Sequence, residues 1–220
     1  MDAPDTVIAK LEPLLLPRRV ARMRAVLAGR SDHVAFVFER MTDPHNLSAA
    51  LRSLDAFGFQ QAHWIAPDPE LGLSRLITRG TDRWLTLVQH ADTATCFAAL
   101  RAAGYRVLGS EVTPSSPPLD TLDLSGRTAF VFGNEHAGVT AETLALADGR
   151  FHIAMHGFAE SLNLSVACAI TAFHCRQALE RLAAAFGDPG RYALPPGRAK
   201  ALYAEWLTQS VRRADVVLER

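Results

Sequence analysis

Residues 34–38 read VAFVF and run into Glu39, so five apolar residues stand in a row. A strand with one face in water alternates apolar and polar residues, whereas a strand buried on both faces is apolar throughout. Such strands are typical of parallel sheets covered by helices. A second run of this kind, TAFVF at residues 128–132, ends at Gly133. The two runs together predict a mainly parallel sheet.

Outward from these runs, strand-like and helix-like segments alternate along the chain. Further strands are expected at residues 62–66, 84–88, 105–109 and 151–155, and helices at residues 46–57, 93–103, 140–147 and 162–185. The alternation is typical of an α/β domain with helices on both faces of the sheet. Two short helices or a helical hairpin are expected at residues 10–29, and a last helix at residues 198–218. We therefore divide the chain into residues 1–31, 32–185 and 186–220.

The charge is zero in total and uneven along the chain. Lys and Arg number 23, as do Asp and Glu, among 220 residues. Residues 1–30 and 176–220 each carry a net charge of +3, which leaves −6 for the segment between them. The total argues against a uniformly basic nucleic-acid binder, but the two ends are basic. Four arginines stand close together at the first end, Arg18, Arg19, Arg22 and Arg24, either on a solvated amphipathic helix or on a helix that grips phosphates.

Three cysteines, Cys96, Cys168 and Cys175, cannot form a closed set of disulfides, which indicates a reducing compartment. Cys168 and Cys175 are seven residues apart and are expected to be small core residues on one helix face. Cys96 has no evident His and acidic partners, so a cysteine nucleophile is not expected. The histidines form no HExxH pattern, and we expect no metal. No apolar run approaches the ~20 residues of a membrane span, so a cytoplasmic protein is expected.

Polar residues gather where three predicted strands end. Asn46 and Arg52 follow the first strand, Glu135 follows the fifth, and Ser161 and Asn163 follow the sixth. Ligands of parallel α/β sheets bind beyond the carboxyl ends of the strands, so these segments form a candidate site. Each residue also has a structural interpretation, since Ser161 or Asn163 suits a helix N-cap and Arg52 suits an exposed helix face. The GxGxxG and P-loop motifs are missing, which disfavours a dinucleotide site and an NTPase.

Taken together, three segments resemble a known family. Residues 46–58 (NLSAALRSLDAFG), 132–139 (FGNEHAGV) and 153–167 (IAMHGFAESLNLSVA) are similar, in order and spacing, to the three motifs of the SpoU (TrmH-type) RNA ribose methyltransferases. The resemblance implies the SPOUT fold, an α/β sheet whose C-terminal part forms a deep trefoil knot. It also implies S-adenosylmethionine bound in the knot loops and a homodimer with active sites at the subunit interface. Short helical extensions at both ends resemble the enzymes that methylate the 2′-hydroxyl of the D-loop guanosine of tRNA.

The resemblance implies roles for individual residues. Arg52 would sit beside the reacting ribose, oriented by Asn46, and the identity of the base stays open. Glu135 and Asn163 would bind the substrate nucleotide, and Ser161 would hold the substrate or its loop. The cofactor would meet the backbone of Ser110, Gly133, Ile153 and Leu162 and the side chains of Met155 and Leu164, while Arg18, Arg19, Arg22 and Arg24 would hold tRNA phosphates. Two positions depart from the family pattern: Ala154 stands where Pro is frequent, and His136 where Lys is frequent.

Three alternatives stay open. The first is a 2′-O-methyltransferase that acts on ribosomal RNA or on the tRNA anticodon loop. The second is a knotted RNA-binding protein without catalysis, against which the joint presence of Asn46, Arg52, Glu135 and Asn163 counts. The third is a metabolic α/β enzyme with a nucleotide cofactor, which the missing phosphate-binding motifs disfavour.

Overall fold

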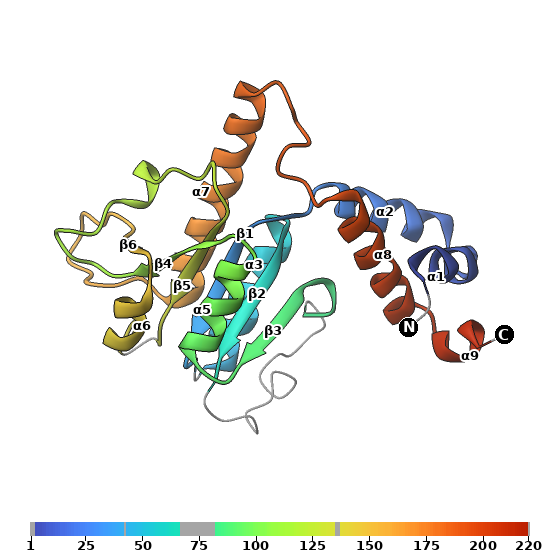
Figure 1. Cartoon of the computed structure of the whole chain (residues 1–220), viewed down its shortest axis with the longest axis horizontal. Coiled ribbons are helices and arrows are strands. Elements are labelled where there is room, and N and C mark those ends of the chain that lie inside the picture. The colour runs from blue at the N-terminus through green and yellow to red at the C-terminus, as the bar shows by residue number, and fades with distance from the viewer. Residues whose placement is uncertain (1–2, 42, 67–81, 135–136, 220) are drawn as a thin grey trace. The chain divides into compact units, whose positions relative to one another are not determined.

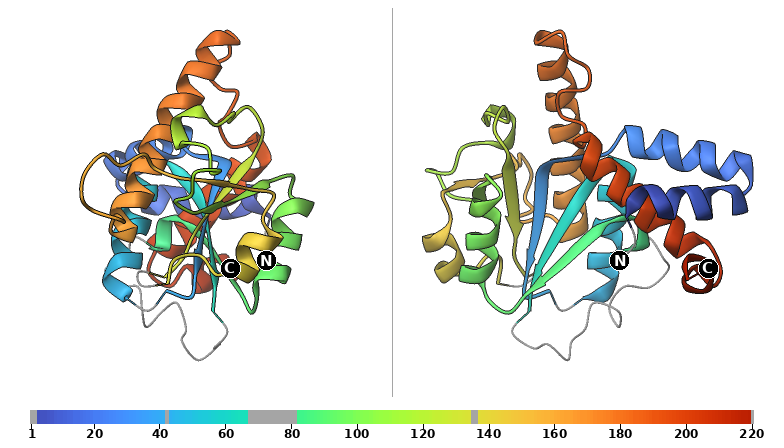
Figure 2. Two further views of the ribbon diagram at one scale, coloured as in Figure 1. Left: turned by 90° about the vertical axis from the view of Figure 1, so that its left-hand side faces the viewer. Right: turned by 45° about the vertical axis from the view of Figure 1, so that its right-hand side comes forward.

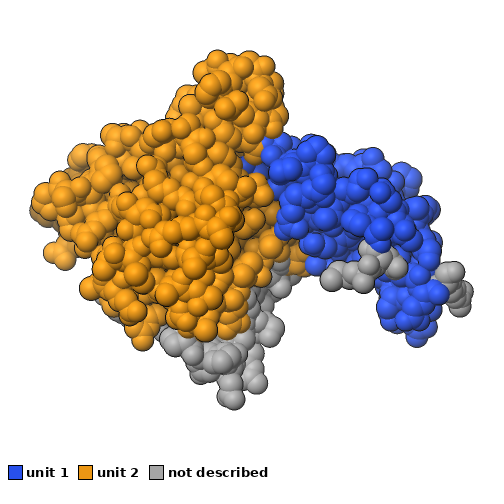
Figure 3. Space-filling model, in the orientation of Figure 1, with its two compact units in different colours: residues 1–31, 193–220 blue, residues 32–192 orange. Residues whose placement is uncertain are grey.

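The computed structural model describes residues 3–41, 43–66, 82–134 and 137–219. The chain forms two compact units (Figure 3). Residues 1–31 and 193–220 make up one unit, and residues 32–192 make up the other. The two ends of the chain, treated as separate segments in the sequence, therefore share one unit, and the boundary on the C-terminal side follows Tyr192.

A six-stranded sheet forms the centre of the larger unit (Figure 1). Its strands are β1 (Ser31–Glu39), β2 (Phe59–Ile65), β3 (Thr86–His90), β4 (Arg106–Ser110), β5 (Thr128–Phe132) and β6 (Gly149–Phe151). Their order across the sheet is β3-β2-β1-β5-β4-β6. The pairs β1–β5, β2–β3, β4–β5 and β4–β6 are parallel. The predicted parallel α/β architecture is confirmed, with the two apolar runs at its centre.

Helices cover both faces of this sheet (Figure 2, left). They are α3 (Pro44–Ala56) and α7 (Leu164–Ala185) on one face, and α5 (Thr93–Ala102) and α6 (Ala141–Leu146) on the other. Alternate residues of β1 serve the two faces, since Phe36 packs with α3 and α7 while Val37 packs with α5. This alternation explains why the strand is apolar throughout.

The face beneath α3 and α7 holds the larger side chains. Phe36, Phe130 and Phe151 are fully buried there, and the ring centroids of Phe130 and Phe151 lie 4.9 Å apart, edge to face. Cys168 and Cys175 are also fully buried on this side of α7. Burial raises the pKa of both thiols, so they stay protonated core residues, as expected.

The sixth predicted strand, at 151–155, was wrong, because β6 ends where its partner ends. The register pairs Ser110, the last residue of β4, with Phe151. Beyond that point His152 bonds to a different segment: its N–H donates to the Pro117 carbonyl, and its own carbonyl accepts from Leu119 N–H. Residues 153–163 then run as a loop into α7. The third strand is also displaced, since β3 spans Thr86–His90 in place of the predicted 84–88.

Four helices form the smaller unit: α1 (Pro4–Leu11), α2 (Pro17–Ala28), α8 (Pro196–Ser210) and α9 (Ala214–Leu218). Pro17 opens α2, as its fixed φ favours at a first helical position. The single helix predicted at 198–218 was wrong, because α8 ends at Ser210, where the extended Val211 follows, and Arg213, with a left-handed φ of 55°, then precedes α9. Trp206 is buried in this unit, with the Arg30 guanidinium 5.4 Å from its ring centroid.

None of the described helices is both long and apolar enough to cross a lipid bilayer.

Candidate functional site

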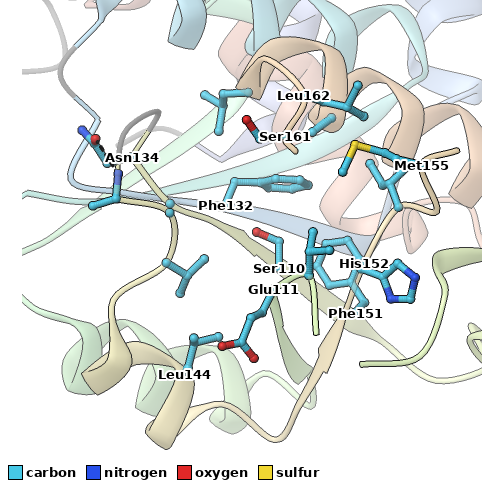
Figure 4. Close-up of a pocket in the computed structure, with 18 residues that line it drawn as sticks. Ser110, Glu111, Phe132, Asn134, Leu144, Phe151, His152, Met155, Ser161 and Leu162 are labelled. Atoms are coloured by element: carbon cyan, nitrogen blue, oxygen red, sulfur yellow. Dashed lines mark hydrogen bonds between the residues drawn. The ribbon is translucent and has the colours of Figure 1, made fainter. Parts of the chain in front are cut away.

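A pocket of about 430 Å³ lies at the carboxyl ends of β4, β5 and β6 (Figure 4). Three loops form it, one after each strand. All six residues predicted to contact the cofactor line it, namely Ser110, Gly133, Ile153, Met155, Leu162 and Leu164. Ser161 lines it as well. Two of the three strand ends that the sequence indicated, those of β5 and β6, border this cavity, and the third border is the end of β4 rather than of β1.

A tight turn after β5 shapes one wall of the pocket. Gly138 N–H donates to the Asn134 carbonyl at 2.8 Å, and Gly138 has a positive φ of 66°. A Cβ built on Gly133 would lie 1.9 Å from the carbonyl carbon of Gly138, far inside contact distance. Only glycine fits at position 133, because the backbone of the same loop passes against it.

Asn134 fastens this turn to the end of β1. Its Nδ2 donates to the Arg40 carbonyl at 3.2 Å, and Arg40 has a left-handed φ of 52°. The loop that opens α3 and the loop that follows β5 are thus joined by a side chain that also lines the pocket. Asn134 was not among the residues predicted to form the site, although it directly follows Gly133, which was predicted to contact the cofactor. Phe132 and Phe151, which line the same cavity and looked like ordinary core residues, were not predicted either.

The wall opposite comes from the loop that leads into α7. Asn163 is the N-cap of this helix: its Oδ1 accepts from Ser165 N–H at 2.8 Å and from the Ser165 hydroxyl at 2.6 Å. Asn163 Nδ2 donates to Asn46 Oδ1 on α3 at 2.9 Å. The neighbours Ser161, Leu162 and Leu164 line the pocket. Asn163 therefore combines the structural role with a contact that joins the first and third motifs.

Three of the other residues assigned to catalysis do not line the pocket. Asn46, Arg52 and Asn163 are not among the described residues that line the pocket. Arg52 is exposed on α3, where its guanidinium is accessible to a polyanion. Glu135 falls outside the described residues, as does His136.

Two polar side chains that line the pocket, Glu111 and His152, belong to the segments that follow β4 and β6. Glu111 follows β4 and pairs with Arg150 across the sheet edge, with 2.5 Å between Oε2 and Nη1. His152 also lines the cavity, and its Nδ1 lies 2.8 Å from the Ser116 carbonyl. Apolar side chains make up most of the rest, so the cavity suits a ligand with both an apolar and a charged part.

The four arginines predicted to bind RNA all lie on α2 of the smaller unit and are exposed. Arg24 is already engaged, since its Nη2 lies 2.7 Å from Glu12 Oε2 and its guanidinium lies 5.5 Å from the Tyr203 ring centroid. Arg19 Nη2 donates to the Ser210 hydroxyl at 3.3 Å. Arg18 and Arg22 also point outward from a helix whose buried side is marked by Met23.

The statement that Cys96 has no histidine partner was wrong. Its thiol lies within 4.8 Å of ligand nitrogens of His63 and His90, because β2, β3 and α5 pack together. The three residues are far apart in the sequence, so spacing alone did not reveal the group. It is separate from the pocket described above.

Comparisons with known proteins fit this geometry. The model of the SpoU rRNA Methylase family matches residues 33–173. The tRNA (guanosine(18)-2'-O)-methyltransferase of Thermus thermophilus is 34% identical over 189 residues, which are 86% of this chain and 95% of that protein.

Two solved structures are similar as well. The TrmH/SpoU tRNA modifying enzyme of A. aeolicus superposes with a TM-score of 0.76 at 24% identity, over 89% of this chain and 98% of that one, which shows a shared fold. The AdoMet-bound rRNA methyltransferase from Sinorhizobium meliloti superposes with a TM-score of 0.59 at 29% identity, over 69% of this chain and 58% of that one. With its family model matched over most of the chain, the protein belongs to the SpoU rRNA Methylase family.

Proposed function

We propose that this protein transfers a methyl group from S-adenosylmethionine to the ribose 2′-hydroxyl of a guanosine in the D-loop of tRNA. The observation that carries the proposal is the pocket formed by the second and third motifs, with all six expected cofactor residues on its wall. The substrate class comes from the Thermus thermophilus relative, whose name states this activity and which aligns over 95% of its length. We also propose a cytoplasmic location, which a tRNA substrate supports.

The residues of the pocket fit the cofactor. Gly133 lets the loop after β5 fold back on itself at the wall of the pocket, since a Cβ there would meet the backbone of Gly138. Met155, Leu162 and Leu164 provide apolar surface for an adenine ring. Glu111 provides a carboxylate in the same cavity, with its charge offset by the ion pair with Arg150. When bound, the cofactor supplies a methyl group already activated by the positive sulfur.

The chain's own residues must then align and deprotonate the ribose hydroxyl. We assign Arg52 to phosphate contact and to stabilisation of the developing alkoxide, because a guanidinium keeps its proton in water and donates several hydrogen bonds. Asn46 positions the start of α3 through its bond with Asn163. Ser161 faces the cavity beside Leu162 and holds the substrate or its loop. Glu135 is proposed to bind the nucleotide, and the base stays unassigned.

We infer that the functional form is a homodimer whose C-terminal part carries the SPOUT trefoil knot. The knot rests on family membership and on the shared fold with the A. aeolicus enzyme. Support for the dimer comes from α7, where Val166, Ile170 and Phe173 expose 45%, 38% and 53% of their surface. Their spacing of four and three residues puts them in one apolar stripe, which a second copy would cover.

The arginines of α2 are proposed to hold tRNA phosphates. A helix that carries Arg18, Arg19 and Arg22 on its exposed surface adds positive charge to a chain with no net charge. Phosphate contacts of this kind give affinity without reading sequence. A dimer would double the number of such helices.

Transfer of labelled methyl groups tests the proposal. The protein is incubated with labelled S-adenosylmethionine and either unmodified tRNA or unmodified ribosomal RNA, and the 2′-O-methyl position is mapped. We expect one modified guanosine in the tRNA D-loop. Methylation of ribosomal RNA or of the anticodon loop would replace the substrate assignment, and cofactor binding without transfer to any RNA would support a non-catalytic RNA-binding protein.

A further inference from the structure

Three side chains that commonly bind metal ions meet on the α5 face of the sheet, away from the pocket. They are His63 of β2, His90 at the end of β3 and Cys96 of α5. One potential ligand atom from each lies within 4.8 Å of the other two, and all three residues are buried. His63 Nδ1 and His90 Nε2 lie 3.0 Å apart.

The sheet brings the two histidines together. Strands β2 and β3 are parallel neighbours, and Ile65 pairs with His90. His63 is two residues before Ile65, so both imidazoles point to the same face of the sheet. Their rings stack with 5.3 Å between centroids and 18° between planes. Cys96 reaches the pair from the helix that covers this face.

The spacing is close to that of a tetrahedral zinc site. Zn–N bonds of about 2.0–2.1 Å and Zn–S bonds of about 2.3 Å put neighbouring ligand atoms roughly 3.3–3.6 Å apart. The nitrogen pair at 3.0 Å is slightly closer than this, and the thiol, within 4.8 Å, is at most about 1 Å too far.

The second ring nitrogen of His63, Nε2, has a hydrogen-bond partner. His63 Nε2 lies 3.2 Å from the Gln61 Oε1. If Nε2 carries the proton and donates it to Gln61, then Nδ1 has its lone pair free for a cation. The imidazole nitrogen of a metal-bound histidine that does not bind the metal usually donates a hydrogen bond to an oxygen.

The protonation states also favour a cation. Burial, and to a lesser degree His90, lower the pKa of His63 to about 4, and burial lowers the pKa of His90 against the opposing effect of Asp92. Both imidazoles are therefore neutral near pH 7 and offer lone pairs. Burial raises the pKa of Cys96 to about 12, so its thiol keeps its proton until a cation displaces it.

A hydrogen bond between two neutral imidazoles accounts for the His63–His90 contact alone. The same network extends from His63 Nε2 to Gln61 Oε1, but it leaves out the Cys96 thiol, which lies within 4.8 Å of ligand nitrogens of both histidines. A bound cation accounts for all four groups at once.

We propose that His63, His90 and Cys96 bind one Zn²⁺ ion per chain at a structural site that ties the edge strand β3 and its neighbour β2 to α5. Two Zn–N bonds and one Zn–S bond form, the S–H bond of Cys96 breaks, and its proton passes to solvent. Water fills the fourth position. The site does not depend on the proposed methyl transfer, because none of its ligands lines the pocket.

Cobalt binding tests the site directly. Untagged protein is stripped with a chelator, and Co²⁺ is added while absorption is recorded, because a tetrahedral Co²⁺–thiolate centre has a charge-transfer band and strong visible bands. We expect these bands to saturate at one Co²⁺ per chain and to vanish when Zn²⁺ is added. Zn²⁺ should also raise the thermal unfolding temperature of the stripped protein. Wild-type protein without the charge-transfer band overturns the proposal.

Variants locate the ligands. Cys96→Ser should lose the charge-transfer band and bind Zn²⁺ at least about 100-fold more weakly, whereas Cys175→Ser is the matched control, a buried helix thiol that should keep the band. Gln61→Leu keeps all three ligands and should weaken Zn²⁺ binding about 10- to 100-fold. If Cys96→Ser does not fold, the Zn²⁺ affinities of His90→Gln and Gln61→Leu test the site instead. A band that survives in Cys96→Ser, or unchanged affinity in both of the other variants, contradicts the site.

Discussion

Asn163 donates a hydrogen bond from Nδ2 to Oδ1 of Asn46, at 2.9 Å, across 117 positions of the chain. The same Asn163 side chain caps α7 by accepting from Ser165 N–H. One residue thus begins the helix of the third motif and holds the start of the helix that carries Arg52. The contact makes the arrangement of the proposed active site depend on a single amide.

Substitutions at Asn163 separate its two roles. Asn163→Asp keeps an oxygen for the cap and loses the donor to Asn46, whereas Asn163→Ala loses both. We expect Asn163→Asp to unfold close to the wild-type temperature and Asn163→Ala to lose about 1 kcal/mol of stability. Both should lose most methyl transfer. Thermal unfolding and single-turnover transfer check this, and wild-type turnover in Asn163→Asp would show that the bond to Asn46 is not needed.

Gly133→Ala should abolish cofactor binding, because the new Cβ would meet the backbone of Gly138 at 1.9 Å and displace the turn after β5. Gly157→Ala is the matched control, since a Cβ at that loop position meets nothing within 4 Å. Isothermal titration with S-adenosylmethionine measures the difference. Equal affinity in the two variants would remove this turn from the cofactor site.

Arg52→Ala should leave the fold and cofactor affinity intact and reduce methyl transfer by at least about 100-fold. The guanidinium is exposed on α3, so its loss creates no cavity and strands no buried partner. Arg52→Lys retains a point charge without the planar fork and should recover only part of the activity. Transfer rates at saturating tRNA test the assignment, which near-normal turnover of Arg52→Ala would refute.

Reversal of Arg19 and Arg22 to Glu should weaken tRNA binding and flatten its dependence on salt, because fewer phosphate contacts release fewer counterions. Cofactor affinity should not change. Arg106→Glu serves as a control, since Arg106 begins β4 at the end of the strand away from the pocket. Binding curves at several salt concentrations give the slope. Wild-type affinity and slope in the reversed variant would exclude α2 from the RNA surface.

The buried histidines make the stability of the metal-free protein depend on pH. His63 faces His90 and the Cys96 thiol, with Asp92 beyond His90, and its pKa is about 4 in the folded chain against 6.5 ordinarily. The unfolded chain therefore binds more protons between these values. The free energy of unfolding should fall as the pH falls from about 6.5 to about 4, by a few kcal/mol at most, at about 1.4 kcal/mol per unit.

Denaturant unfolding of chelator-treated protein across this range measures the effect. His63→Asn keeps a polar group near the Nδ1 position and removes the titration, so its stability should change less with pH. If the free energy of unfolding changes equally with pH in wild-type protein and in His63→Asn, the pH dependence arises from other groups.

Local sequence was sufficient for the centre of the fold. The run at residues 128–132 is β5 itself, and the run at 34–38 lies within β1, because a strand buried on both faces needs apolar residues throughout. The strand-end rule indicated the loops after β5 and β6, whereas the residues predicted to contact the cofactor, Ser110 after β4 included, came from the resemblance to the SpoU family.

Three other features required the tertiary structure. The sixth strand stops at Phe151 because β4 offers no further partner, although residues 153–155 are as apolar as many strands. The last predicted helix breaks at Val211, which is extended, although neither glycine nor proline stands there in the sequence. Position 133 requires glycine because the backbone of Gly138, five residues later, folds back against it.

By itself, then, the sequence determined the alternating α/β pattern, the inner strands and the three motifs, because each depends on residues close together along the chain. The tertiary structure alone decided which distant side chains meet. It places Asn163 within hydrogen-bond distance of Asn46, Arg24 in an ion pair with Glu12, and Cys96 close to His63 and His90. Such contacts arise from the register of strands and the packing of helices, which no spacing in the sequence records.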